Sequence, residues 1–497
     1  MADARRLVDK LWAYCDVLRD DGVGVIEYTE QLTYLLFLKM AHERATRKLA
    51  PERIVPEAYD WSRLTDASGT ELESLYTSML ENLATQPGVV GTIFRKAQNR
   101  IQDPAKLKRL VSDLIDKEHW SSSGTDLTGD AYEELLAKGA ADQKSGAGQY
   151  FTPRALVHAI IDCVRPTVAD WVVDPACGTG GFLLMAHEYA AQGAATMTPD
   201  QRDHLRDSLV TGYELVDGTA RLAAMNMLLH GIGSSGGESL IEVRDSLAAD
   251  PGRRWSVVVT NPPFGTKSAL TTVGSDGKAV REDASVERQD FTVSTSNKQL
   301  NFVQHIATIM DVNGRAAVVL PDNVLFEGGA GETIRRRLLT DFDLHTMLRL
   351  PTGIFYAQGV KANVLFFDKK PARPGVPWTE HLWVYDLRTN QHFTLKQSPL
   401  RRNHLDEFVA SYLPERPRSE RRESERWRSY SYEELVTRDK ANLDITWLKD
   451  DSLEDLDNLP APEVIAREII EDLTAALAEF EAVATALEEP VKARRAP

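Results

Sequence analysis

The stretch Asp170-Trp171-Val172-Val173-Asp174-Pro175-Ala176-Cys177-Gly178-Thr179-Gly180-Gly181 decides the fold class of this chain. Its apolar first half predicts a buried strand, and the apolar run that follows, Phe182 to Ala186, predicts a helix. A glycine loop between a strand and a helix lets the backbone approach a ligand closely at the carboxyl edge of an open α/β sheet. The sequence therefore predicts a doubly wound α/β sheet with a ligand site at this loop.

The loop matches neither of the two common phosphate-binding patterns, G-x-G-x-x-G and G-x-x-x-x-G-K-[ST], so a ligand without phosphate is favoured. Two further predicted strands, Leu209 to Tyr213 and Leu240 to Arg244, end in the carboxylates Glu214 and Asp245. An acidic residue after the second strand can hold both hydroxyls of a ribose, and Asp245 can accept from an adenine amino group. Adenosine is therefore the expected ligand, although each carboxylate alone is also compatible with a solvated strand end.

A stiff turn, Asn261-Pro262-Pro263-Phe264, follows a fourth predicted strand, Val257 to Thr260. The prolines fix φ and lack an N–H, which leaves carbonyls free to accept hydrogen bonds. The Asn261 amide oxygen and the Pro262 carbonyl could together grip an amino group, and Phe264 offers a face for a flat ring. The turn predicts a site for a planar exocyclic amine, and an ordinary proline-rich turn is the alternative.

These motifs resemble those of a known enzyme class. Asp174 to Leu183 resembles the first motif of S-adenosylmethionine-dependent methyltransferases, and Asn261 to Phe264 resembles the catalytic motif of amino-methyltransferases. Ahead of both, Gly148 to Arg154 resembles the motif that cradles the cofactor's methionine end in adenine-N6 DNA methyltransferases, and this order is the gamma arrangement. The resemblance implies S-adenosylmethionine as cofactor, with contacts from Gln149, Tyr150, Phe151, Thr152, Pro153, Arg154, Asp174, Gly178, Thr179, Gly180, Gly181, Glu214 and Asp245. It implies catalysis by Asn261, Pro262, Pro263 and Phe264.

Nearly the whole chain resembles the modification subunit of type I restriction-modification systems. The markers are Leu7 to Lys39, Thr128 to Glu133, Ser431 to Leu435 and Asn442 to Leu448. The resemblance implies a Rossmann-like domain that methylates N6 of an adenine flipped out of double-stranded DNA. It also implies that two copies flank one specificity subunit, and that a restriction subunit is a further partner.

Several domains are expected, because 497 residues exceed one usual domain. We expect an N-terminal helical domain over residues 1–140, a catalytic domain over 141–400, a connector over 401–461 and a C-terminal helix over 462–497. The last segment carries a heptad seam formed by Ile469, Leu473, Ala476, Phe480, Val483 and Leu487. This helix could pack on its own chain, but the resemblance favours docking on a specificity subunit.

Two charged segments and the remaining strands complete the expected organisation. The polar stretch from Gly265 to Gln299 predicts a long loop that orders over DNA, with functionless disorder as the alternative. Mixed arginine and glutamate over residues 416–428 predict a solvated face rather than a phosphate contact. Further strands are predicted at Arg315 to Leu320, His345 to Leu350, Ala362 to Phe367 and His381 to Asp386.

Composition limits the cellular setting and the partners. The 58 Lys and Arg against 74 Asp and Glu give a net charge of −16, and a chain this acidic is not expected to hold duplex DNA tightly by itself. Three widely spaced cysteines without C-x-x-C favour a reducing cytosol. Neither a signal peptide nor a membrane span is expected. The sequence offers no obvious metal-ligand cluster, so no metal is expected.

Rival functions remain open from the motifs alone. The Asn-Pro-Pro-aromatic device also suits N-methylation of a protein glutamine or an RNA guanine, and a solitary adenine DNA methyltransferase is a further alternative. Cytosine-C5 methylation is disfavoured, because none of Cys15, Cys163 and Cys177 has the context of the nucleophile it needs. A non-catalytic assembly subunit that binds S-adenosylmethionine as a regulator is the rival from another class, and the intact Asn261 to Phe264 motif disfavours it.

Overall fold

A computed structural model of the chain describes residues 11–14, 25–48, 51–118, 120, 152–234, 236–264, 269–273, 279–283, 285–355, 360–394 and 398–449. The described residues up to Thr446 belong to one compact unit, which the chain division separates from Trp447–Pro497. Three predictions lie outside the described residues: the motif positions 148–151, the marker segment 128–133 and the heptad seam of 462–497. Among the described helices, none combines the length and the apolar character that a membrane crossing requires.

The N-terminal part is helical, as the sequence predicts. Its buried side chains, among them Leu35, Phe37 and Tyr76, form a core between α2 and the helices that follow it. The described elements are α2 Val25–Ala45, η1 Glu57–Tyr59, α3 Trp61–Asp66, α4 Gly69–Leu83, α5 Gly88–Phe94, α6 Pro104–Lys108 and the π-helical turn η2 Arg109–Ile115.

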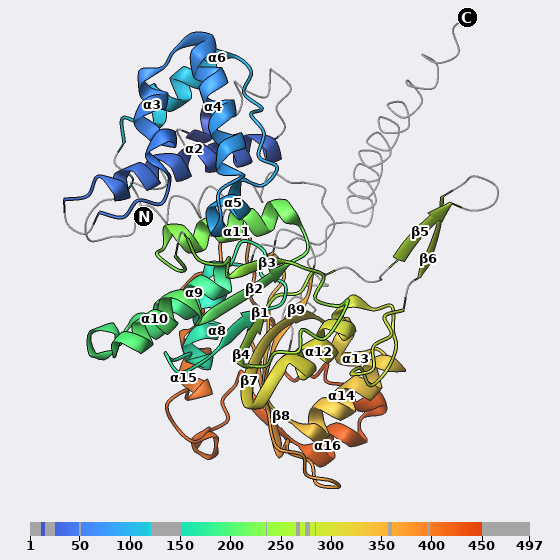
Figure 1. The fold of residues 1–497 in the computed structure, drawn as a ribbon. Coiled ribbons are helices and arrows are strands. Elements are labelled where there is room, and N and C mark those ends of the chain that lie inside the picture. Colours follow the sequence, from blue (N-terminus) through green and yellow to red (C-terminus); the bar gives the residue numbers. More distant parts are fainter. Residues whose placement is uncertain are drawn as a thin grey trace, which may run out of the picture. The chain divides into compact units, whose positions relative to one another are not determined.

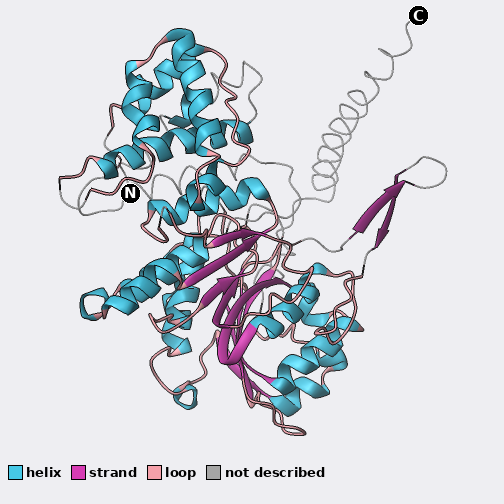
Figure 2. Ribbon diagram, in the orientation of Figure 1, coloured by secondary structure: helices cyan, strands magenta, loops and turns pink. Residues whose placement is uncertain are grey.

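A nine-stranded mixed sheet forms the centre of the remaining chain (Figures 1 and 2). Its spatial order is β11-β10-β8-β9-β7-β4-β1-β2-β3, in which β9 runs antiparallel to both β7 and β8, and β11 runs antiparallel to β10. The strands are β1 Val172–Asp174, β2 Val210–Glu214, β3 Ile241–Val243, β4 Trp255–Thr260, β7 Met310–Pro321, β8 Phe342–Arg349, β9 Ala362–Lys369, β10 His381–Asp386 and β11 Trp427–Ser431.

Helices cover both faces of this sheet (Figure 1). Helices α8 and α9 pack on each other and contact β1, β2, β4 and β7, whereas α12 and α14 contact β7 and β8. Their bounds are α8 Arg154–Val164, α9 Gly181–Ala191, α10 Pro199–Asp207, α11 Asp217–Leu229, α12 Lys298–Ile309, α13 Asn323–Phe326, α14 Ala330–Asp341, α15 Asp406–Tyr412 and α16 Tyr432–Thr437, with short 3-10 turns η3 Ala194–Thr196, η4 Arg402–Leu405, η5 Arg418–Glu420 and η6 Asp439–Ala441. The prediction of a doubly wound α/β fold is confirmed.

The sheet order places two loops side by side. The chain moves outward from β1 through β2 to β3, then returns to add β4 on the other side of β1. Parallel pairing sets Val172 against Val257 and Val173 against Val258. Ligands bind in open α/β sheets at such a reversal, outside the carboxyl ends of the strands. The glycine loop after β1 and the turn after β4 therefore leave neighbouring strands at one edge.

The opposite edge of the same strands carries a saturated ionic cluster. Arg315 donates from Nη1 to Asp170 Oδ1 at 3.1 Å and from Nη2 to Asp170 Oδ2 at 2.9 Å. The Ser256 hydroxyl and the Thr167 backbone N–H donate to the same carboxylate, each at 2.8 Å. Burial alone would raise the pKa of Asp170, but the hydrogen bonds and charge of Arg315 outweigh it and hold that pKa at about 2.

Two sequence predictions about charged segments need correction. The polar stretch after the Asn261 to Phe264 turn contains a separate antiparallel hairpin of β5 Ala269–Val273 and β6 Ala279–Asp283, so it is not a loop throughout. The prediction of a solvated face over 416–428 is wrong for Arg418 and Arg421. Arg421 is 3% exposed and donates to Thr346 Oγ1 at 3.0 Å, and Arg418 pairs with Asp343 at 2.5 Å. These arginines are bound within the fold.

Candidate active site

The glycine loop is fixed by backbone contacts that need its glycines. Cys177 N–H donates to the Tyr213 carbonyl at 2.9 Å, and Gly180 N–H donates to the Cys177 carbonyl at 2.8 Å. Gly178 and Gly180 have φ of +55° and +86°, a region that side chains rarely adopt. A side-chain carbon on Gly180 would lie 2.9 Å from the Met227 Cε of α11. The loop therefore packs closely on α11.

Asp174, the last residue of β1, stabilises the glycine loop through a hydrogen bond to its backbone. Its side chain is 1% exposed, and Oδ1 accepts from the Ala176 N–H at 3.0 Å. Burial raises the pKa of Asp174 to about 7. On the other side of the loop, the Asn226 amide donates to the Thr179 carbonyl at 3.0 Å. Asp174 thus holds backbone in this structure, and Asn226 is a supporting residue that the sequence analysis did not identify.

Glu214 reaches the same loop from the end of β2. Its Oε2 accepts from the Gly178 N–H at 3.1 Å, and its Oε1 accepts from the Val216 N–H at 2.9 Å. Burial raises the pKa of Glu214. The next residue, Leu215, has an exposed fraction of 65%, which is high for a leucine. Glu214 is therefore oriented at the loop, with an apolar side chain open to a ligand beside it.

Asp245 is an exposed residue in the turn that follows β3. The Leu247 N–H donates to Asp245 Oδ1 at 2.9 Å. The neighbouring Ser246 is buried, and its hydroxyl donates to the Pro175 carbonyl at 2.6 Å. This contact joins the Asp245 turn to the start of the glycine loop. Ser246 was not singled out from the sequence, because its partner lies 71 residues away.

Among the described residues, only one of the two polar atoms of the Asn261 side chain has a hydrogen-bond partner. Its Nδ2 donates to the Thr152 hydroxyl at 2.9 Å, which brings the predicted residues Thr152 and Asn261 together across 109 residues of chain. The Oδ1 of Asn261 is buried, yet it has no hydrogen-bond partner in the part of the chain that the structure describes. A buried, unpaired acceptor is costly and marks a place where a ligand donor would be stabilising.

The rest of the turn is braced by residues that the sequence did not reveal. Gln299, near the start of α12, donates from Nε2 to the Pro263 carbonyl at 3.2 Å. Asn297 caps α12 by accepting from the Gln299 and Leu300 N–H groups at 3.0 and 3.2 Å. The Phe264 ring meets Phe355 edge to face, with 5.6 Å between centroids. The turn is therefore preorganised by contacts from distant segments.

The described predicted residues gather at the β1 and β4 edge. Thr152 joins Asn261, Pro153 precedes the first residue of α8, Arg154, and Asp174, Glu214 and Gly178 form one cluster. Gln149, Tyr150 and Phe151 lie outside the described residues. A side-chain carbon on Gly178 or Gly181 would meet no described atom within 4 Å, so the loop faces open space. The described residues contain no group of three or more His, Cys, Asp or Glu able to hold a metal ion.

Comparisons with known proteins agree with this geometry. Residues 123–451 match the family model described as N-6 DNA Methylase, and residues 7–114 match the HsdM N-terminal domain. The chain is 40% identical to the type I restriction enzyme StySPI methylase subunit of Salmonella potsdam and to the EcoKI methylase subunit of Escherichia coli. Each alignment covers 96% of this chain and 94% of the relative.

Solved structures give the same result. The crystal structure of the type I restriction enzyme EcoKI M protein is similar at 36% identity and a TM-score of 0.52, over 97% of this chain and 96% of that one. A chain from a solved type I R-M system is similar at 27% identity and a TM-score of 0.68, over 97% and 98%.

The fold and the family models define an N6-adenine DNA methyltransferase. Within that class, the chain belongs to the family of type I restriction enzyme methylase subunits. The predicted family, fold class and enzyme class are therefore confirmed. Methylation of protein glutamine or RNA guanine is not favoured by any of these relatives.

Proposed function

We propose that the β1 and β4 edge binds S-adenosylmethionine beside an adenine flipped out of double-stranded DNA. When bound, this cofactor supplies an electrophilic methyl group. The open space beside Gly178 and Gly181 supports the assignment, because backbone can approach a ligand there without side chains intervening. The residues proposed to hold the cofactor are Gln149, Tyr150, Phe151, Thr152, Pro153, Arg154, Asp174, Gly178, Thr179, Gly180, Gly181, Glu214 and Asp245.

Glu214 and Asp245 have distinct proposed roles. Glu214 would accept from the ribose hydroxyls, because its Oε2 already contacts the glycine loop at Gly178 and each of its oxygens keeps a further lone pair. Asp245 is exposed and would accept from the adenine amino group of the cofactor. Leu215, which is 65% exposed, provides apolar surface for a ring beside Glu214. Asp174 would act indirectly, through the loop backbone that it holds.

The unpaired Asn261 Oδ1 is the observation that carries the proposed chemistry. Its lone pairs would accept one hydrogen of the target amino group, and the Pro262 carbonyl would accept the other. Holding both hydrogens draws the nitrogen lone pair out of conjugation with the ring and directs it at the methyl group. Phe264 would stack on the flipped base, which offsets part of the few kcal/mol that flipping costs. Preorganised acceptors of this kind lower the barrier without rearranging.

Sequence choice is proposed to come from a partner. With a net charge of −16, the chain is poorly suited to neutralise DNA phosphates alone. We propose that two copies assemble with one specificity subunit, that residues 462–497 dock on it, and that a restriction subunit joins this complex. The domain bounds proposed are 1–140, 141–400, 401–461 and 462–497, and residues 265–299 are proposed to contact DNA. The buried free thiols of Cys163 and Cys177 support a reducing, cytoplasmic setting.

One experiment tests the proposal. The chain, alone and combined with its specificity subunit, should be assayed for gel shift and tritiated methyl transfer at about 150 mM salt, where exposed charges are strongly screened. We expect site-specific N6-adenine methylation only in the complex. Asn261→Ala in that complex should lower the rate by about 10²–10³, the typical cost of one preorganised acceptor, while calorimetry shows nearly unchanged S-adenosylmethionine binding.

The contrary outcomes have separate meanings. Asn261→Ala with activity near wild type would overturn the catalytic assignment. Tight, site-selective methylation by the chain alone would instead indicate a solitary methyltransferase with its own recognition element. Failure of the wild-type complex to bind S-adenosylmethionine would overturn the cofactor assignment.

A further inference from the structure

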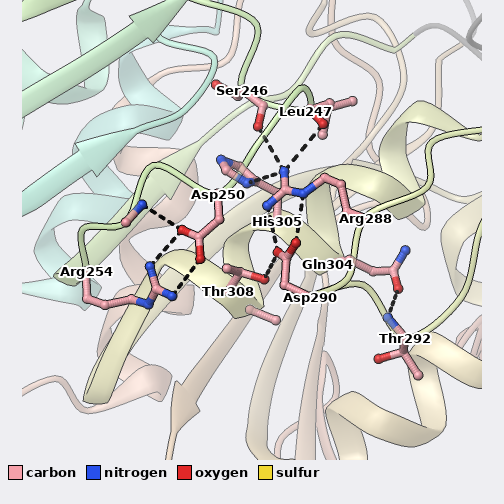
Figure 3. A network of polar contacts seen from close by, with 12 residues as sticks. Ser246, Leu247, Asp250, Arg254, Arg288, Asp290, Thr292, Gln304, His305 and Thr308 are labelled. Carbon is pink, nitrogen blue, oxygen red and sulfur yellow. Dashed lines mark hydrogen bonds and ion pairs between the residues drawn. The ribbon is translucent and has the colours of Figure 1, made fainter.

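Arg288 is the centre of a polar network that reaches Ser246 and Leu247, the two residues after Asp245 (Figure 3). Its side chain is 5% exposed. The guanidinium donates from Nε and Nη2 to the Asp290 carboxylate at 3.0 and 2.6 Å, which is a bidentate pair. Its remaining Nη1 donates to the Ser246 carbonyl at 3.2 Å and lies 3.4 Å from the Leu247 carbonyl. The Nη1 group of this buried cation therefore contacts the backbone carbonyls of the turn.

The network around Arg288 leaves it little freedom. The Thr308 hydroxyl of α12 donates to Asp290 Oδ2 at 2.6 Å. His305 Nδ1 lies 3.1 Å from Arg288 Nη1, and burial, with the nearby Arg288 charge, lowers the pKa of His305 to about 3, so the ring is neutral and can accept there. The guanidinium also lies over the Phe291 ring, 4.3 Å from its centroid. Arg288 is therefore oriented from several sides toward the turn.

The turn that Arg288 holds is the one that carries Asp245. Asp245 Oδ1 accepts from the Leu247 N–H at 2.9 Å, and the Ser246 hydroxyl donates to the Pro175 carbonyl at 2.6 Å. The three consecutive residues are thus fixed by their own backbone, by the glycine loop and by Arg288. Because Asp245 is exposed, its direction depends on this backbone rather than on side-chain packing.

We propose that Arg288 is a positioning residue for the adenine end of the cofactor. It holds the Ser246 and Leu247 carbonyls so that the Asp245 carboxylate meets the 6-amino group of the adenine. This inference rests on the proposed function of Asp245. It assigns discrimination between a 6-amino and a 6-oxo purine to a residue 43 positions after Asp245 in the sequence, which touches no part of the ligand.

The same network offers a matched control. Arg254 makes an equivalent bidentate pair with Asp250, at 2.8 and 2.9 Å (Figure 3). No hydrogen bond from Arg254 to the Ser246 or Leu247 carbonyl is present in the described residues. Loss of Arg254 therefore removes a second bidentate ion pair, more exposed than that of Arg288, without releasing the Asp245 turn.

The test compares two ligands on the full complex. S-adenosylhomocysteine carries the 6-amino group, and S-inosylhomocysteine carries a 6-oxo group. Calorimetry should give their dissociation constants for wild type, Arg288→Met, Arg288→Lys and Arg254→Met. We expect Arg288→Met to weaken binding of S-adenosylhomocysteine by about tenfold, the scale of one hydrogen bond to a charged group, and to leave S-inosylhomocysteine nearly unchanged. Arg288→Lys keeps the charge but not the planar fork, so it should recover only part of the preference.

Two results would overturn the inference. One is an equal loss of affinity for both ligands in Arg288→Met or, should that variant not fold, in Arg288→Lys. The other is the same loss of preference in Arg254→Met, which would indicate a general effect of weakening the network. A wild-type complex that binds neither ligand would instead overturn the proposed function, and the inference with it.

Discussion

Asp170 lies two residues before strand β1 and Asp174 is the last residue of that strand, and the fold shifts their pKa values in opposite directions. Asp170, at the amino edge, accepts from Arg315, Ser256 and Thr167, and its pKa falls to about 2. Asp174, at the carboxyl edge, is buried and forms no ion pair with the residues that the structure describes, and its pKa rises to about 7. The carboxylate before β1 therefore stabilises the fold as an anion, whereas the fold opposes ionisation of the carboxylate at the end of β1.

The two edges of the sheet differ in role: the amino edge stabilises the fold, and the carboxyl edge carries the candidate site. The Asp170 carboxylate at the amino edge is fully paired, whereas the carboxyl edge keeps Asn261 Oδ1 unpaired and leaves open space beside Gly178. Unpaired buried polar groups are found at functional sites because a ligand satisfies them only when it binds. The carboxyl edge is thus destabilised in the form described here, and the amino edge supplies stability to the same strands.

The largest expected change in stability is the pH dependence that Asp174 contributes at the carboxyl edge. A carboxyl whose folded pKa is raised binds its proton more tightly when folded, so stability should fall as pH rises from about 4 to about 7. Asp174 should contribute a decrease of about 4 kcal/mol across that window, given about 1.4 kcal/mol per pKa unit. Asp174→Asn should flatten this part of the profile. Urea unfolding at several pH values measures it, and an unchanged slope in Asp174→Asn would contradict the assignment.

A smaller change in stability, with the opposite dependence on pH, is expected when the Asp170 ion pair at the amino edge is removed. Arg315→Met removes the cation that lowers the pKa of Asp170, and we expect a loss of about 2 kcal/mol of stability at neutral pH. Because that contribution exists only while Asp170 is ionised, the difference from wild type should shrink as pH falls from about 4 to about 2. Methyl transfer by the folded variant at low temperature should match wild type. A large loss of catalytic rate there would show that the two edges are not separable.

The smallest change in stability is expected when a single methyl group is added to the glycine loop. Gly178→Ala places a side chain at φ +55°, which should cost about 1 kcal/mol of stability, and fills space proposed for the cofactor. Gly252→Ala is the matched control, since Gly252 has φ +73° and equally open surroundings but lies outside the site. Both variants should lose similar stability, and only Gly178→Ala should weaken S-adenosylmethionine binding, by about tenfold. Equal affinities in calorimetry would argue against a cofactor beside Gly178.

The strands of the site were predictable because central parallel strands are buried on both faces and appear as continuous apolar runs. Val257, Val258 and Val259 have an exposed fraction of 0%, in agreement with that pattern. The strand ending at Glu214 was predictable for the same reason, and the strand near Asp245 was also found although it is an exposed edge strand, with boundaries shifted by one or two residues. Loop chemistry then followed from proline and glycine, whose backbone constraints are local.

The supporting contacts could not be predicted, because they join segments far apart in sequence. Gln299 reaches Pro263 across 36 residues and Arg288 reaches Ser246 across 42, and no local pattern encodes such pairs. Burial of Arg421 was missed since charged side chains are mostly exposed, and mixed charge usually indicates solvent. The β5 and β6 hairpin was missed because its segment is polar and rich in turn residues. The role of each predicted site residue stays a prediction until binding is measured.

The place of β9 between β7 and β8 has a consequence for how the chain folds during synthesis. Strand β8 leaves the ribosome before β9, yet in the finished sheet it touches β7 only through β9, which pairs with both. Until residue Lys369 has emerged, β7 and β8 each present an unpaired edge, the kind of surface that pairs with other chains. Strands β1 to β4 can pair early, but β7 and β8 become part of one sheet only when β9 inserts between them. Premature termination between residues 349 and 362 should therefore yield aggregating fragments.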